Sequence, residues 1–153
     1  MFLIQLAFWL GWGSLGLALL KYLELPAYLP AETVELGTPG QFSVGSVTFF
    51  ALYKAWLVRS PEGFYALQAV CPHLGCQPRW QAQGQAFSCP CHGSRFDSEG
   101  SLLQGPALRS LARLHIFLSP GGQIGLNLRQ TYQAEAGEWQ APGAFLNWPE
   151  RTS

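Results

Sequence analysis

Charged side chains are scarce in this chain of 153 residues, where Asp, Glu, Lys and Arg together make up 12% of the sequence. Nine basic residues balance nine acidic ones, and no run of Lys or Arg forms the positive stripe that nucleic-acid binding requires. We therefore expect no nucleic-acid partner. Apolar residues reach 48%, and this balance favours a chain that associates with a membrane.

Charge is absent altogether from residues 2–20, which read FLIQLAFWLGWGSLGLALL. About twenty apolar residues in a helix cross a hydrocarbon core of roughly 30 Å. A cleaved signal peptide is the alternative, but such a segment has a basic start, a shorter apolar core and a small-residue cleavage site. We therefore predict a retained transmembrane helix over residues 1–24 in the lipid bilayer, and a neck over residues 25–32 that Pro26 and Pro30 stiffen.

A convincing helical period is also lacking after residue 25, and the chain has no internal repeat. Instead, short runs of β-branched and aromatic residues alternate with turns rich in Gly, Pro and Ser. This pattern predicts an all-β domain of antiparallel strands over residues 33–128, then an irregular tail over residues 129–153 whose aromatic residues dock on something. The expected strands cover residues 42–50, 54–60, 63–70, 85–90 and 114–119.

All four cysteines and two of the three histidines lie within 22 residues, in CPHLGC at 71–76 and CPCHGSRF at 89–96. Zinc would take four of these side chains in a tetrahedron. Two structural disulfides would use the cysteines alone. A two-iron, two-sulfur cluster would take one Cys and one His from each motif and leave one further Cys in each. Gly75 and Gly93 suit such a cluster, because a backbone without a Cβ can approach sulfide closely.

The two motifs closely resemble those of the Rieske iron–sulfur proteins of cytochrome bc and bf complexes. The resemblance extends to the membrane anchor, the neck and GPA at 105–107, which is similar to the family's proline loop over the cluster. Rieske ferredoxins and oxygenases lack the extra cysteine pair, so Cys76 and Cys91 argue against that branch. The implied fold is a Rieske-type antiparallel β-sandwich with a small cluster-binding subdomain at about residues 71–107.

The resemblance implies a [2Fe-2S] cluster with Cys71 and Cys89 on one iron and His73 and His92 on the other. It also implies that the remaining two cysteines, Cys76 and Cys91, form a disulfide that clamps the two motifs together. The other residues that it places beside the cluster are Leu74, Gly75, Ser94, Phe96, Gly105 and Pro106.

The function implied by the resemblance is quinol oxidation by a subunit of a quinol:cytochrome c or plastocyanin oxidoreductase. His92 has the position of the exposed ligand that accepts a hydrogen bond from quinol in a cytochrome b subunit, and a c-type haem then receives the electron. The alternatives are a Rieske subunit of another oxidoreductase, resembling arsenite oxidase, and a zinc-stabilised interaction module.

The implied disulfide also predicts the location of the domain, since such a bond persists only in an oxidising compartment. We expect the domain on the periplasmic or positive side of the cytoplasmic membrane of a bacterium, or of an equivalent energy-conserving membrane. The chain would cross that membrane once, with its N-terminus inside.

We also make predictions for Phe96 and His115, which lie outside the implied ligand set. High-potential family members have a tyrosine two residues after the serine that corresponds to Ser94, which itself donates a hydrogen bond to cluster sulfur. This chain has Phe96 there, which cannot donate, so we predict a lower potential suited to menaquinol or another low-potential quinol. Core packing alone is the alternative for Phe96. His115 is expected to be a packed or surface residue rather than a ligand.

Overall fold

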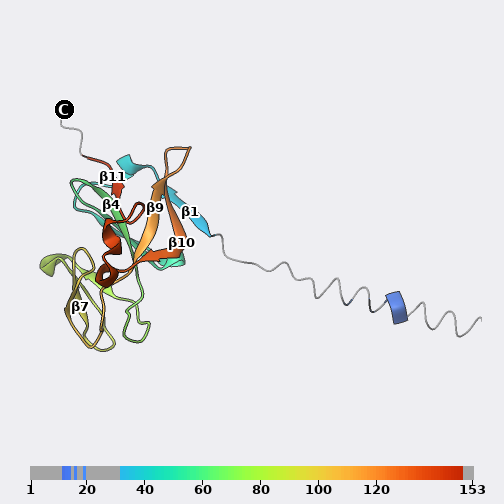
Figure 1. Ribbon diagram of the computed structural model, residues 1–153, viewed down its shortest axis with the longest axis horizontal. Coiled ribbons are helices and arrows are strands. Elements are labelled where there is room, and N and C mark those ends of the chain that lie inside the picture. Colours follow the sequence, from blue (N-terminus) through green and yellow to red (C-terminus); the bar gives the residue numbers. More distant parts are fainter. Residues whose placement is uncertain (1–11, 15, 17–18, 20–31, 150–153) are drawn as a thin grey trace, which may run out of the picture. The chain divides into compact units, whose positions relative to one another are not determined.

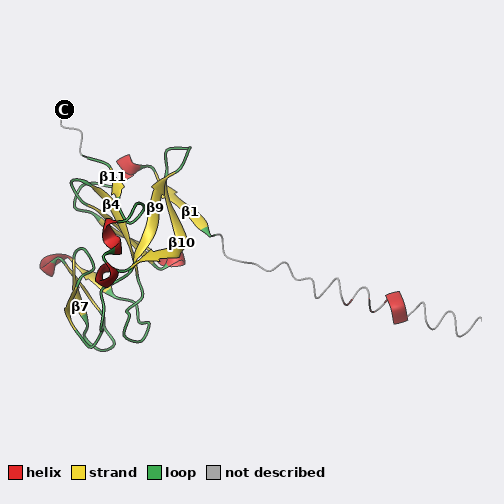
Figure 2. Cartoon of the chain, in the orientation of Figure 1, coloured by secondary structure: helices red, strands yellow, loops and turns green. Residues whose placement is uncertain are grey.

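The protein is described by a computed structural model (Figures 1 and 2). The described residues are 12–14, 16, 19 and 32–149. The chain divides into two compact units, Met1–Ala31 and Glu32–Ser153. The predicted transmembrane helix and neck lie almost wholly outside the described residues. Within those that are described, no helix is long and apolar enough to cross a membrane.

The larger of two sheets has seven strands, all paired antiparallel, in the order β1-β10-β9-β4-β3-β2 with β11 paired to β4. Its strands are β1 (Thr33–Gly37), β2 (Val47–Phe50), β3 (Ala55–Arg59), β4 (Gly63–Gln68), β9 (Arg113–Leu118), β10 (Ile124–Tyr132) and β11 (Leu146–Asn147). Short 3-10 turns connect several of the strands of the domain: η1 (Pro39–Gln41), η2 (Ala51–Tyr53), η3 (Ala82–Gly84), η4 (Ala134–Ala136) and η5 (Glu138–Gln140).

The smaller sheet is an insertion between β4 and β9, and its strand β7 lies beyond one end of β4 and β9 in Figure 1. Its four antiparallel strands, in spatial order, are β5 (Arg79–Gln81), β6 (Ala86–Ser88), β7 (Arg95–Asp97) and β8 (Leu102–Gln104). The insertion creates two loops, one over residues 69–78 between β4 and β5 and one over residues 89–94 between β6 and β7. The four cysteines and the two histidines of both motifs lie in these loops. The prediction of an all-β fold is confirmed, and its sheets are antiparallel.

Strands β3 and β4 are buried on both faces because each face contacts a different hydrophobic core. Side chains alternate between the two sides of a strand. In β3, Trp56 and Val58 contribute to one core, whereas Ala55 and Leu57 contribute to the other. The central strands can therefore be continuously apolar and still belong to an antiparallel sheet.

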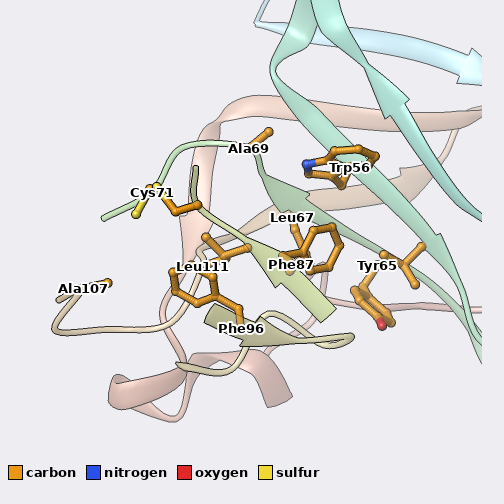
Figure 3. Packing of buried hydrophobic residues seen from close by; sticks show 11 residues of the cluster. Trp56, Tyr65, Leu67, Ala69, Cys71, Phe87, Phe96, Ala107 and Leu111 are labelled. Atoms are coloured by element: carbon orange, nitrogen blue, oxygen red, sulfur yellow. The ribbon is translucent and has the colours of Figure 1, made fainter. Parts of the chain in front are cut away.

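The first of these cores joins the two sheets and carries the cysteine loops (Figure 3). Phe87 of β6 and Phe96 of β7 are fully buried in it beside Leu67 of β4. Cys71 and Ala107 lie toward one end of the cluster in Figure 3, and Tyr65 lies toward the other. The packing that connects the sheets thus also fixes the start of the first cysteine loop.

Two expectations about secondary structure need correction. The strand predicted over residues 42–50 is wrong in its first half, because the chain turns at Gly45, with φ at +83°, and β2 begins only at Val47. The sequence analysis also placed no strand over β10, which runs to Tyr132 and enters the segment predicted to be an irregular tail. This strand pairs with both β1 and β9 and has an irregular register between Asn127 and Thr131.

The tail after β10 packs against the domain through its aromatic residues, as expected. The Trp139 ring lies over the guanidinium of buried Arg113, with 4.2 Å from Cζ to the ring centroid, and Tyr65 covers the same group at 4.5 Å. Phe145 stacks on Tyr65 with 6.4 Å between ring centroids. Cation–π contacts of a desolvated Arg stabilise by about 2 kcal/mol, so this stack holds the tail in place.

Candidate metal centre

The two cysteine loops have the same backbone hydrogen bonds. In the first loop, the amide of Cys71 donates to the carbonyl of Cys76 at 2.7 Å, and the amide of Gly75 donates to the carbonyl of Cys71 at 2.9 Å. The equivalent bonds of the second loop measure 2.8 Å and 3.0 Å. Gly75 and Gly93 take φ values of +81° and +77°, which L side chains rarely adopt. Each loop is therefore a tight turn of the same kind.

A disulfide between Cys76 and Cys91 joins the loops, with 6.5 Å between the Cα atoms. The Sγ atom of Cys89 lies within 4.8 Å of both disulfide sulfurs. Those two sulfurs are bonded to each other, so these three cysteines do not form a set of three free thiolate ligands. The disulfide instead holds the loops together directly beside one free thiol.

Cys71 and Cys89 are free thiols with only 1% and 2% of their surface exposed. Burial raises the pKa of the Cys71 thiol above its usual range, a backbone hydrogen bond at His73 opposes the rise, and a hydrogen bond with the Cys89 thiol adds to it. Cys71 and Cys89 are therefore neighbours in the site. A metal ion would have to displace a proton that burial holds on the sulfur.

The two histidine rings meet at 4.8 Å between centroids and are nearly perpendicular, at 87°. His73 is partly buried, and its Nδ1 atom is buried without a hydrogen-bond partner among the described residues. His92 is exposed. A buried imidazole nitrogen without a partner is costly unless something binds it. This atom therefore points to a bound group.

The residues present fit a [2Fe-2S] cluster with two thiolate and two imidazole ligands. Two buried thiols and two adjacent imidazoles supply this donor set. The orphaned nitrogen of His73 is an atom that such a group would satisfy. The alternative with two disulfides differs from the structure, because Cys71 and Cys89 remain free.

Ser94 connects the second loop to the GPA segment. Its side chain is fully buried, and its Oγ atom accepts a hydrogen bond from the amide of Ala107 at 2.9 Å. The hydroxyl also lies close enough to Cys71 to lower the pKa of its thiol. The sequence analysis named the GPA motif but chose as site residues only Gly105 and Pro106, which are exposed, and not Ala107, which is buried. Ala107 acts through its backbone, so only its place in the GPA motif could have indicated it.

The remaining candidates have different environments. Leu74 is 69% exposed at the tip of the first loop, next to His73. Phe96 has no exposed surface and pairs with Phe87 across the smaller sheet. His115 lies in β9, where its Nδ1 atom is 2.8 Å from the hydroxyl of Tyr132.

Comparison with known proteins identifies the fold of this site. The sequence profile of the Rieske [2Fe-2S] domain matches residues 27–116. This match covers more than half of the chain and includes both cysteine loops and the GPA segment.

The cytochrome b6-f complex iron-sulfur subunit of Synechococcus elongatus is 48% identical over 73 residues, which cover 42% of this chain and 41% of the relative. The chloroplastic subunit of Chlamydomonas reinhardtii is 47% identical over 60 residues, which cover 39% of this chain and 29% of the relative. The matched part of the chain thus spans less than half the length of these curated relatives. A chain of the solved structure of a hyperthermophilic respiratory Complex III is 27% identical, with a TM-score of 0.54, and the match covers 79% of this chain and 97% of that one.

Proposed function

The chain belongs to the Rieske [2Fe-2S] family, and on this premise we propose that it is the iron–sulfur subunit of a membrane cytochrome bc-type complex that oxidises quinol. In this role it takes an electron from quinol and passes it to a c-type haem. One observation carries the proposal: exposed His92 lies against the more sheltered His73, and the same two loops carry two buried free thiols. The relatives support it, because they are iron–sulfur subunits of cytochrome b6-f complexes.

In this proposal Cys71 and Cys89 hold one iron, and His73 and His92 hold the other. The bound cluster supplies a one-electron acceptor whose charge controls the acidity of its imidazole ligands. The buried cysteines keep water from the sulfur ligands, and the disulfide between the loops keeps the four ligand side chains together. Gly75 and Gly93 allow the turns that aim them.

His92 is the residue that meets quinol. Its exposed imidazole accepts a hydrogen bond from the quinol hydroxyl at its outward ring nitrogen and takes the proton there. Leu74 is exposed on the neighbouring loop and gives this contact an apolar border that excludes water. Gly105 and Pro106 are exposed on the segment that contacts Ser94, and the proposal assigns them to the other side of the border.

The arrangement of the whole chain follows from the same proposal. Residues 1–24 form the transmembrane helix and residues 25–32 the neck. The Rieske domain runs from residue 33 to the end of β10 at Tyr132, and the tail follows it. The Cys76–Cys91 disulfide supports a location in an oxidising compartment, on the positive side of an energy-conserving membrane, with the N-terminus inside.

Purification from the membrane tests this function. We expect a cytochrome b subunit and a c-type cytochrome to co-purify with the full chain, and protease added to right-side-out vesicles to digest the Rieske domain. A molybdenum protein in place of cytochrome b would reassign the chain to another oxidoreductase. Zinc in place of iron and sulfide would contradict the redox function itself, and a domain protected from protease would reverse the topology.

Substitution of Phe96 by tyrosine is expected to raise the midpoint potential of the cluster. A tyrosine hydroxyl that donates to a sulfur ligand stabilises the more negative reduced state. A hydrogen bond to a charged group stabilises by about 1.5–3 kcal/mol. With about 59 mV per 1.4 kcal/mol for one electron, the rise would be roughly 60–120 mV at full effect. A redox titration of wild type and Phe96→Tyr measures it.

The matched control for that experiment is Phe87→Tyr. Phe87 is equally buried and pairs with Phe96 across the sheet, but its ring packs between Trp56 and Trp80. We expect the control to lose stability without any rise in potential. A potential that stays level or falls in Phe96→Tyr would show that Phe96 serves only in core packing.

A further inference from the structure

The segment after residue 116 lies outside the matched Rieske domain, yet it binds a loop beside the metal centre. The carboxylate of Glu135, on the 3-10 turn η4, accepts a hydrogen bond from the amide of Ser110 at 2.7 Å. We propose that Glu135 is a positioning residue that holds the loop over residues 105–111 and thereby aims the Ser94 hydroxyl at the cluster. The inference rests on the proposed function in that it takes Ser94 to donate to cluster sulfur.

Hydrogen bonds hold the loop over residues 105–111 at two positions that are close together in the sequence. At one end, the Ala107 amide donates to the Ser94 hydroxyl at 2.9 Å. At the other, Ser110 is bound to Glu135 through its amide, and its Oγ atom accepts from the Leu102 amide at 3.2 Å. Both Ala107 and Ser110 are buried, and only two exposed residues separate them. A displacement of Ser110 therefore moves Ala107.

The hydrogen bond from the Ala107 amide restricts the orientation of the Ser94 hydroxyl. A hydroxyl has one proton to donate and two lone pairs that accept. Because the Ala107 amide occupies a lone pair of Ser94, the hydroxyl keeps its own proton free to donate to sulfur. Without the amide, the hydroxyl can rotate away from sulfur. The potential of the cluster would then lose one hydrogen bond that favours reduction.

Glu135 is fixed well enough to act in this way, because the tail around it is anchored. Trp139 stacks on Arg113, and its indole nitrogen donates to the carbonyl of Tyr132 at 3.2 Å. Burial alone would raise the pKa of Glu135, but the hydrogen bonds from Ser110 lower it overall. Ionised Glu135 is therefore bound to the loop.

The sign of the effect separates positioning from simple electrostatics. Removal of a negative charge favours reduction of the cluster and raises its midpoint potential. Loss of an aimed hydroxyl disfavours reduction and lowers the midpoint. A fall after removal of the Glu135 carboxylate is thus opposite to the effect of its charge.

Glu138 offers a matched control in the same tail. Its carboxylate accepts a hydrogen bond of the same length, 2.7 Å, from the amide of Gln133, but that bond lies within the tail and does not touch the loop. Glu138→Ala removes the same charge and the same kind of bond as Glu135→Ala. The two variants therefore differ in their connection to Ser94.

The experiment is a redox titration of the full chain with its cluster in wild type, Glu135→Ala, Glu138→Ala, Ser94→Ala and the double variant Ser94→Ala with Glu135→Ala. We expect Glu135→Ala to lower the midpoint toward that of Ser94→Ala, and Glu138→Ala not to lower it. We expect the midpoint of the double variant to equal that of Ser94→Ala, because Glu135 acts on the cluster only through Ser94. Amide hydrogen exchange over residues 105–111 should be faster in Glu135→Ala.

Three results would overturn the inference. These are a midpoint in Glu135→Ala that is unchanged or raised, an equal fall in Glu138→Ala, and a further fall when Glu135→Ala is added to Ser94→Ala. If Ser94→Ala itself leaves the midpoint unchanged, the inference also fails, since its target has no influence. The proposed quinol function is judged separately, by the subunits that co-purify with the chain.

Discussion

Replacement of either His73 or His92 by alanine is expected to abolish the cluster, whereas His115→Ala retains it. The rings of the two predicted ligands lie 4.8 Å apart between centroids, on the two loops that the disulfide joins, and each would supply one of two imidazoles to a single iron. Loss of one ligand leaves an open coordination position that water and oxidants reach. Iron and acid-labile sulfide should fall to background, and the EPR signal of the reduced protein should disappear.

His115 is the appropriate control because it is the third histidine of the chain and is hydrogen-bonded to Tyr132 in β9. The His92 variant is the more decisive of the two ligand variants. His92 is exposed, so its removal should leave the fold intact by circular dichroism. Full iron and sulfide content in His92→Ala would show that the ligand assignment is wrong.

Removal of the disulfide should have the second large effect, on stability rather than on ligand identity. The bond closes a loop with a sequence separation of 15 residues. By the chain-entropy estimate, a crosslink over such a loop stabilises by about 3 kcal/mol. We expect Cys76→Ser combined with Cys91→Ser to lower the free energy of unfolding by about this amount and to release iron faster.

The measurement is urea unfolding followed by circular dichroism, with absorbance of the cluster recorded in parallel. The midpoint of the transition should fall, and its slope should rise, because the unfolded chain without the crosslink is less compact and exposes more surface. Wild type under reducing conditions is the matched comparison, and its free energy of unfolding should equal that of the double variant. The reductant should not change the stability of the double variant. A loss below about 1 kcal/mol, at the lower end of the known range, would mean that the loops do not depend on their crosslink.

The site residues were accessible to sequence reasoning because their chemistry is local. Four cysteines and two histidines at short, fixed spacing leave few chemistries open, and glycines at the turns give the same answer. Strands β3 and β4 were also predictable, since apolar residues run continuously between turns. Neither inference required knowledge of what lies far away in the sequence.

The parts that were missed depend on distant partners. Strand β10 has partly exposed polar residues in its second half and is formed because β1 and β9 pair with its two edges. The amide of Ala107 leaves no pattern in the sequence, since every residue except proline has a backbone N–H. The position of Trp139 over Arg113 joins two segments whose proximity only the folded sheets create.

The crosslink between the loops also determines where the polypeptide can be cut. The segment enclosed between Cys76 and Cys91 contains the turn over residues 82–85, whose four residues are all exposed. An exposed turn of small and polar residues is a preferred site for proteases and for inserted sequences. A break there would leave the fragments covalently joined, each carrying one thiol and one imidazole of the proposed ligand set. The centre is thus held by a covalent connection that does not depend on the continuity of the backbone.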